Sequence, residues 1–269
     1  MTAAGSITAL NAPAMLVGAL AGMTADVRRR ALAAEPARAA IWIRAAAACG
    51  LAAGQVCYGR LLLEGRGVAR DPAKALALFR RAAEAGDPDG LNMVGRCLEN
   101  GWGAPADLAE AQRCYRLAAE AGHDWAQYNL GHLHLNGHGV PRDAGLAFHW
   151  YRRAADQGHV RAMNLVGRCL EQGWGAPPDP AAARDWYERS ARGGYFRGQY
   201  NFGLILADEG RIDEALPWLA AAIAEAPAPS RRIMAVALAA RPEPAIAALG
   251  ASRAAARQTQ AQLEVAPCS

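Results

Sequence analysis

Residues 126–158 read AQYNLGHLHLNGHGVPRDAGLAFHWYRRAADQG, and this stretch contains the pattern that decides the fold. Apolar and small side chains recur at helical spacing before Gly137 and again after Asp143. Such recurrence predicts two helices joined by a loop that contains Gly137 and Gly139. Asp143 is suited to cap the start of the second helix, and Gly158 is suited to end it.

The same pattern recurs at intervals of 36 residues on both sides of this stretch. Four full units cover roughly residues 55–90, 91–126, 127–162 and 163–198. The columns that keep the step are Gly59, Gly95, Gly131, Gly167 and Gly203; Gly50, Gly86, Gly122, Gly158 and Gly194; and Asp71, Asp107, Asp143 and Asp179. A repeat of this size indicates an all-α array of helix-turn-helix units whose core runs through the stack.

The predicted core contains a column of rings and a column of small apolar side chains. The rings are Phe79, Tyr115, Tyr151 and Tyr187. Packing between helices explains these rings better than a ligand-binding box does. Cys97 and Cys169 share a column with leucine and isoleucine, which indicates buried thiols. The six cysteines form no Cys-x-x-Cys pair, so we expect reduced thiols in a cytoplasmic protein.

The array degrades towards both ends, as expected where one face of a repeat meets water. We expect an N-terminal helical cap over residues 1–36 and a repeat array over 37–226. The array comprises a half unit, four full units and a shortened fifth unit that lacks the Gly-x-Gly loop. A C-terminal helical cap is expected over 227–257, kinked near its prolines. The tail at 258–269 is expected to be disordered.

Composition argues against several classes of function. The net charge is +4, Lys74 is the only lysine, and the longest basic run is Arg28-Arg29-Arg30, so nucleic-acid binding is not predicted. The first 23 residues lack the basic start and long apolar core of a secretory signal. No stretch is long and apolar enough to predict a membrane span.

The pattern Leu130-Gly131, Gly137-x-Gly139-Val140, Asp143, Ala154-Ala155 and Gly158 closely resembles the Sel1-like repeat. The resemblance covers about residues 39–226, and the fifth unit is more similar to the related tetratricopeptide repeat. It implies an α-solenoid that acts as a non-enzymatic scaffold or adaptor for other proteins, without a cofactor. A cysteine-rich subset of the family is linked to β-lactam binding or hydrolysis, but this chain lacks the cysteine pair in each unit.

By analogy with tetratricopeptide repeats, the first helix of each unit lines the inner face. Its polar columns alternate with a double period, with Asn and Arg in one unit and Tyr in the next. The candidate partner-binding residues are Arg60, Asn92, Arg96, Tyr128, His132, Asn164, Arg168 and Tyr200. Recent tandem duplication is the simpler explanation of this alternation, since Gly-Arg-Cys-Leu-Glu-x-Gly-Trp-Gly-Ala-Pro occurs both at 95 and at 167.

The functional hypothesis is that each Asn–Arg pair, one helical turn apart, binds a carboxylate through paired hydrogen bonds. Tyr128 and Tyr200 would supply flat contact surfaces between the pairs. The ligand would be an extended acidic segment or a chain terminus of a partner protein. Glu99 and Glu171 count against it, because each can neutralise the arginine three residues earlier.

No catalytic constellation or metal site is predicted. The six histidines lie between 123 and 159, but His132 and His134 diverge on a helix and no acid or cysteine completes a standard ligand set. The alternative function is a hydrolase-like, small-molecule-binding or metal-binding protein with a site in the groove or at one end of the array. The oligomeric state is left open.

Overall fold

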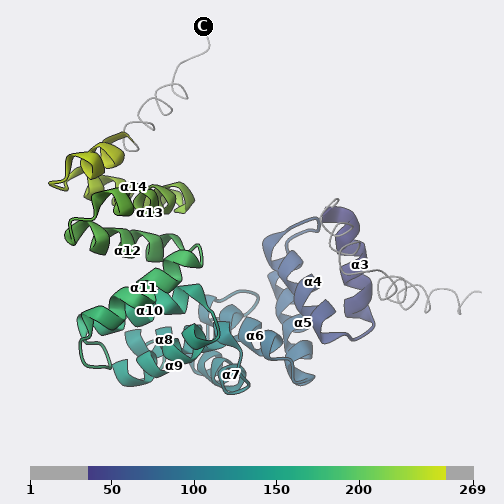
Figure 1. Cartoon of the computed structure of the whole chain (residues 1–269). Coiled ribbons are helices and arrows are strands. Elements are labelled where there is room, and N and C mark those ends of the chain that lie inside the picture. The colour runs from purple at the N-terminus through teal and green to yellow at the C-terminus, as the bar shows by residue number, and fades with distance from the viewer. Residues whose placement is uncertain (1–35, 253–269) are drawn as a thin grey trace, which may run out of the picture. The chain divides into compact units, whose positions relative to one another are not determined.

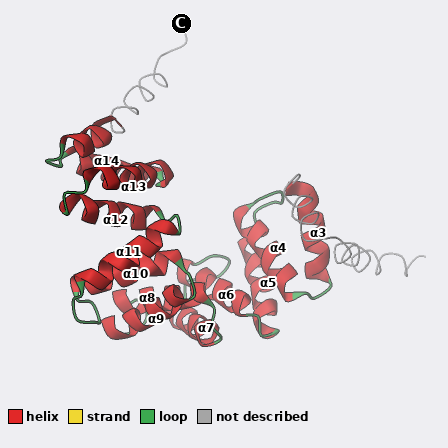
Figure 2. Ribbon diagram, viewed as in Figure 1, coloured by secondary structure: helices red, strands yellow, loops and turns green. Residues whose placement is uncertain are grey.

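The computed structural model describes residues 36–252, with side chains from residue 40 onwards. These residues form helices joined by loops and turns, and none of them forms a strand (Figure 2). The predicted N-terminal cap at 1–36, apart from its last residue, lies outside the described residues, as do residues 253–257 of the predicted C-terminal cap and the predicted tail at 258–269. No helix in the described part is long and apolar enough to cross a membrane.

The described chain folds into twelve helices with defined bounds, and a further helical stretch begins at residue 244 (Figure 1). The helices are α3 Pro36–Ala48, α4 Ala52–Glu64, α5 Pro72–Glu84, α6 Pro88–Asn100, α7 Leu108–Glu120, α8 Asp124–Asn136, α9 Ala144–Asp156, α10 Val160–Gln172, α11 Pro180–Arg192, α12 Phe196–Asp208, α13 Ile212–Glu225 and α14 Ala228–Ala239. The chain divides into two compact units, Met1–Arg142 and Asp143–Ser269.

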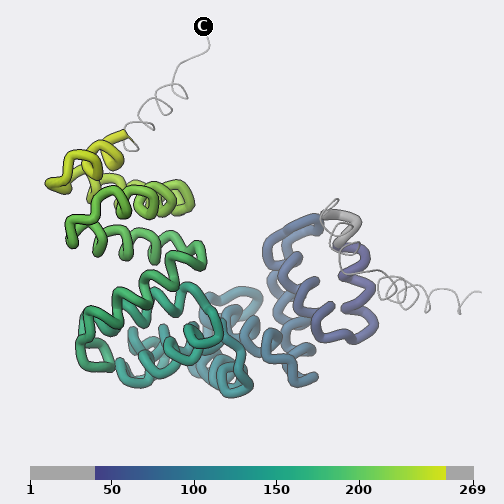
Figure 3. The backbone as a smooth tube through the Cα atoms, viewed as in Figure 1, coloured from purple at the N-terminus to yellow at the C-terminus, as the bar shows by residue number. Residues whose placement is uncertain are grey.

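Within each unit, every helix packs on the next one in the chain. The helices of a repeat form an antiparallel pair, as α4 with α5 and α12 with α13 show in Figure 3. First helices of neighbouring repeats also touch, α4 with α6 and α10 with α12. This arrangement confirms the predicted all-α solenoid and its 36-residue spacing.

The second helix of each full repeat begins at the aspartate that recurs every 36 residues. Asp71, Asp107, Asp143 and Asp179 each accept a hydrogen bond from the backbone N–H three residues later. The distance from Glu110 N to Asp107 Oδ1 is 2.8 Å. Each of these side chains therefore satisfies one backbone donor that the helix leaves without a partner.

Replacing Asp107 with alanine should remove the cap of α7 and lower the free energy of unfolding by about 1 kcal/mol. Asp107→Asn should retain most of the stability, because the amide oxygen can still accept the bond. Urea unfolding followed by circular dichroism measures both variants. Equal losses for alanine and asparagine would show that the cap is not the source of the effect.

The ring column lies in the core, as predicted. Phe79, Tyr115, Tyr151 and Tyr187 are each at most 1% exposed. The glycine column of the first helices makes room for these rings. A Cβ added to Gly95 would lie 2.7 Å from Cε1 of Tyr115, too close for an undisturbed packing. The fixed spacing of the glycines therefore follows from the close approach of each first helix to a ring of the second.

The C-terminal part departs from the regular repeat. The shortened fifth unit consists of α12 and α13, which are joined by a turn at Gly210 with a φ of +78° in place of the Gly-x-Gly loop. Beyond α13, the cap is not one kinked helix. Helix α14 ends at Ala239, and the chain turns before it becomes helical again at residue 244. Pro242 and Pro244 lie in and directly after that turn, where a missing N–H donor is tolerated.

Candidate partner-binding site

A pocket of about 510 Å³ opens on the first helices of the N-terminal unit. Its lining comes from α4, α6, the start of α8 and the loops between them. The residues are Arg60, Leu63, Glu64, Arg70, Asn92, Met93, Arg96, Trp102 and Trp125. Three candidates from the sequence, Arg60, Asn92 and Arg96, thus meet in one cavity.

Arg70 and Arg96 line this pocket without an ion pair to any described residue, and Nε of Arg70 donates to the backbone carbonyl of Leu63 at 3.1 Å. Arg96 is exposed, and its guanidinium carbon lies 5.7 Å from the centre of the Trp102 ring. Glu99 does not neutralise it. Instead the Glu99 carboxylate accepts a hydrogen bond of 2.7 Å from the hydroxyl of Tyr115. Burial, with the charge of Glu99 added to it, raises the pKa of Tyr115, so the hydroxyl remains a donor.

Asn92 differs from the expectation that it faces solvent. It is only 3% exposed, and its Oδ1 accepts a hydrogen bond of 3.0 Å from Nδ2 of Asn129 on α8. Two first helices approach closely here, so their polar side chains pair with each other. The Asn92 amide therefore joins neighbouring repeats, and Arg96 remains as the exposed member of the predicted pair.

Arg60 is held by an acid. Its Nη2 lies 2.6 Å from Oδ1 of Asp89, and Nε2 of His123 lies 3.6 Å from the same oxygen. Burial disfavours the ionised form of Asp89, but the hydrogen bond to His123 and the charge of Arg60 outweigh it and lower the pKa of this carboxyl. Arg60 is thus neutralised and does not face the pocket as a spare charge.

Tyr128 and His132 do not line this pocket. They pack against each other on α8, with ring centres 4.6 Å apart in an edge-to-face arrangement. Trp125 contacts Tyr128 from the preceding turn, at 6.0 Å between ring centres. Trp125 is 41% exposed, and it is the member of this cluster that reaches the pocket.

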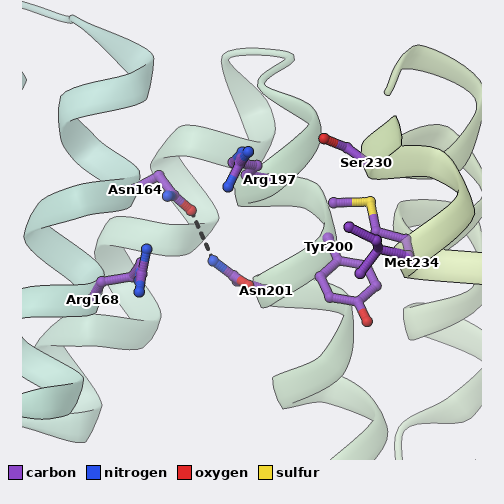
Figure 4. A pocket seen from close by; sticks show the side chains of 8 residues that line it. Asn164, Arg168, Arg197, Tyr200, Asn201, Ser230 and Met234 are labelled. Atoms are coloured by element: carbon purple, nitrogen blue, oxygen red, sulfur yellow. Dashed lines mark hydrogen bonds between the residues drawn. The ribbon is translucent and has the colours of Figure 1, made fainter. Parts of the chain in front are cut away.

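The C-terminal unit has its own pocket, of about 270 Å³, on α10, α12 and α14 (Figure 4). It is lined by Asn164, Arg168, Arg197, Tyr200, Asn201, Ser230, Ile233 and Met234. Three further candidates from the sequence, Asn164, Arg168 and Tyr200, therefore meet here.

The details of the first pocket recur in the second. Asn164 is 2% exposed, and its Oδ1 accepts a hydrogen bond of 2.8 Å from Nδ2 of Asn201. The guanidinium carbon of Arg168 lies 5.2 Å from the Trp174 ring centre. The hydroxyl of Tyr187 donates to Glu171 at 3.0 Å, which again leaves the arginine without an acid partner among the described residues.

These asparagine pairs explain part of the alternation seen in the sequence. Asn92 and Asn164 are acceptors, whereas Asn129 and Asn201 are donors 37 residues later. Asn129 and Asn201 also recur at a spacing of 72 residues, so the sequence shows that they belong to the same alternation. Their pairing with Asn92 and Asn164 depends on how closely the helices approach, which the periodicity does not give.

Sequence reasoning also missed Trp125 and Arg197. Both stand in one variable column, 72 residues apart, and each lines the pocket of its own unit. The residues from α14 lie beyond the repeats, so no equivalent position in another unit identifies them. Within residues 36–252, no group of three or more His, Cys, Asp or Glu side chains is arranged to hold a metal ion.

Cys97 and Cys169 are buried, as the sequence predicts, whereas Cys49 and Cys57 are exposed. Cys97 and Cys169 are at most 1% exposed, and burial raises the pKa of both thiols to about 11. No disulfide joins the five cysteines of the described residues, whose thiols are free. Protonated, buried thiols pack as small apolar groups and are poor nucleophiles.

A family model for the Sel1 repeat matches residues 52–87, 88–123, 126–159 and 160–195. The chain belongs to the Sel1 repeat family. The four matched segments correspond to the four full repeats recognised from the glycine and aspartate columns. The half unit at α3 and the shortened unit of α12 and α13 lie outside them. No curated protein matched the sequence.

Solved structures of other Sel1 repeat proteins are similar to this one. A protective antigen of uropathogenic Escherichia coli strains, which displays an SLR fold, is 26% identical with a TM-score of 0.69. The match covers 91% of this chain but only 54% of the antigen, so this Sel1 repeat protein spans about half of that relative's length. A Sel1 repeat protein from Oxalobacter formigenes is 28% identical with a TM-score of 0.63, over 75% of this chain and 86% of that one.

An immunity protein from Pseudomonas aeruginosa shares the fold at 17% identity and a TM-score of 0.50, covering 73% of this chain and 74% of that one. At this level the likeness concerns the fold and carries nothing about activity.

Proposed function

We propose that this Sel1 repeat protein is a non-enzymatic interaction module that binds carboxylate-bearing segments of partner proteins on its first helices. The observation that carries the proposal is the recurrence of one arrangement in both units. In each unit, an arginine with no acid partner lies beside a buried asparagine pair and lines a pocket.

The chemistry of Arg96 and Arg168 supports a carboxylate ligand. A guanidinium fork binds both oxygens of a carboxylate, and aromatic support restricts its motion before binding. Trp102 and Trp174 supply that support. The glutamates that could have competed are instead hydrogen-bonded to Tyr115 and Tyr187.

The pockets also offer apolar contact beside the charge. Met93 and Trp125 line the N-terminal pocket, and Ile233 and Met234 line the C-terminal one. Aromatic and arginine side chains dominate the energetics of protein–protein contacts, which fits a partner polypeptide better than a small polar metabolite.

The test is affinity capture from the native host, with partners quantified by mass spectrometry. Arg96→Glu/Arg168→Glu should reduce capture of the specific partners by about tenfold or more, because two attractive contacts become repulsive. Circular dichroism would verify that the variant keeps its helices.

The matched control is Arg81→Glu/Arg113→Glu. Both arginines are exposed on the second helices α5 and α7 and make no ion pair within the described residues, so the change in net charge is identical. Capture should remain at the level of the unaltered protein. Equal capture by both double variants would contradict the proposed role of the first-helix arginines.

A further inference from the structure

The pocket of the C-terminal unit contains two cations and no acid. Arg168 projects from α10 and Arg197 from α12, and no acidic side chain lines the cavity. Neither arginine forms an ion pair with a described residue, and their guanidinium carbons lie 5.2 Å from the Trp174 ring centre and 5.5 Å from the Phe196 ring centre. In the N-terminal pocket, by contrast, Glu64 is part of the lining.

The two guanidinium groups flank the asparagine pair. Figure 4 shows the hydrogen bond between Asn164 and Asn201 in the space between Arg168 and Arg197. Since Nδ2 of Asn201 donates to Asn164, its Oδ1 is the atom left to accept, and no described residue donates to it. The site therefore presents charged donors and one acceptor next to each other.

Helix α14 adds mainly apolar groups to the pocket. Met234 and Ile233 of α14 and the ring of Tyr200 of α12 line it, with Ser230 as the polar residue that α14 contributes. Ile233 is 71% exposed, the largest exposure among the large apolar side chains of the described residues. Ile233 therefore offers apolar contact beside the charged groups of the pocket.

The neighbouring charges do not compete for the ligand. Arg241, which acts on Tyr200 electrostatically, is bound to Asp208 at 2.6 Å and to Glu243 at 2.8 Å. Arg241 is thus neutralised by two carboxylates, and the cluster carries one net negative charge. Arg168 and Arg197 are thus the two uncompensated charges that line this cavity.

We propose that this pocket binds the C-terminal residue of a partner polypeptide, with its carboxylate between Arg168 and Arg197. The inference rests on the proposed function and assigns the ligand of one of its two sites. The backbone N–H of the terminal residue donates to Oδ1 of Asn201. An apolar terminal side chain packs against Ile233 and Met234.

A chain terminus fits better than an internal Asp or Glu because of how its groups are placed. A terminal residue carries a carboxylate, a side chain and an amide N–H around one Cα, and the pocket offers a partner to each. At about 270 Å³, the cavity lies below the ~300–1,000 Å³ range of pockets for drug-sized ligands, so it suits one or two residues.

The experiment uses N-terminally labelled peptide pools whose last positions vary, each prepared with a free carboxylate or with an amide end. Binding to the full-length protein is measured by fluorescence anisotropy. Free-acid peptides that end in Leu, Ile, Val or Phe should bind at least about tenfold more tightly than their amides. Peptides ending in Asp, Lys or Gly should bind more weakly than the apolar set.

Two variants test the individual contacts. Arg197→Gln should weaken binding of the free-acid peptides about tenfold and leave the amides unchanged, because only the charge-assisted contact is lost. Ile233→Ser should reduce the preference for apolar ends. The control is Arg232→Gln, which changes an exposed arginine next to Ile233 that does not line the pocket, and binding should stay the same.

The result that overturns the inference is equal binding of free-acid and amidated peptides, or no binding of either. Tight binding of amidated peptides with internal acids would also overturn it, while agreeing with the proposed function. The two failures are distinguishable, because the proposed function is lost only when capture of host partners no longer depends on Arg96 and Arg168.

Discussion

Gly103→Ala is expected to lower the free energy of unfolding by about 3 kcal/mol, from about 1 kcal/mol of backbone strain and about 2 kcal/mol of overlap. Gly103 has a φ of +81°, which an L side chain rarely adopts. A Cβ there would overlap the carbonyl of Pro72 and lie 2.9 Å from Cα of Ala73. These are backbone atoms at the start of α5, so the neighbour cannot rotate away.

Gly122→Ala separates strain from overlap. Gly122 has a φ of +92°, but a Cβ at this position would meet nothing within 4 Å. Its replacement should therefore cost only about 1 kcal/mol. Urea unfolding of both variants, monitored by far-ultraviolet circular dichroism, gives the difference. If both substitutions lowered the free energy of unfolding equally, the contact between the Gly-x-Gly loop and the preceding repeat would not contribute to stability.

Tyr115→Ala is expected to lower the free energy of unfolding by about 3–5 kcal/mol. The ring is fully buried, and its removal would leave a cavity between α6 and α7 and would also free the carboxylate of Glu99. Leu117→Ala, on the same helix, is the control. Leu117 is 49% exposed, so its truncation should change stability by no more than about 0.5 kcal/mol.

A double-mutant cycle tests whether the ring requires the glycine opposite it. Gly95→Ala alone should cost about 1–3 kcal/mol, because the new methyl would press on the Tyr115 ring. In the Tyr115→Ala background the same methyl enters the vacated space and should cost less. Strictly additive losses would mean that Gly95 is needed for some other reason than its contact with Tyr115.

The sequence predicts the fold well because the constraints that end and begin helices are local. An aspartate cap such as Asp107 and a positive-φ glycine such as Gly101 each fix a helix end within a few residues. The ring column was equally readable, since a large apolar side chain at a fixed step has to be buried. The end of α14 was less predictable, because two nearby prolines are compatible with either a kink or a break.

The sequence predicts only part of the candidate site. Arg96 and Arg168 were recognised by their column, and both line pockets. Burial of Asn92 was not foreseen, because a helical wheel assigns the face of a residue but not how closely the next first helix approaches. The role of Arg197 likewise depends on α14, which lies outside the repeats and supplies one wall of the pocket.

The asparagine pairs have a consequence for how the chain can change in length. Deleting the 36 residues 127–162 would bring Leu165 to the position of Asn129, which leaves the buried amide of Asn92 without a partner. Deleting the 72 residues 127–198 would instead bring Asn201 to that position and restore the pair. Insertions and deletions in relatives of this protein should therefore be tolerated more readily two repeats at a time than one.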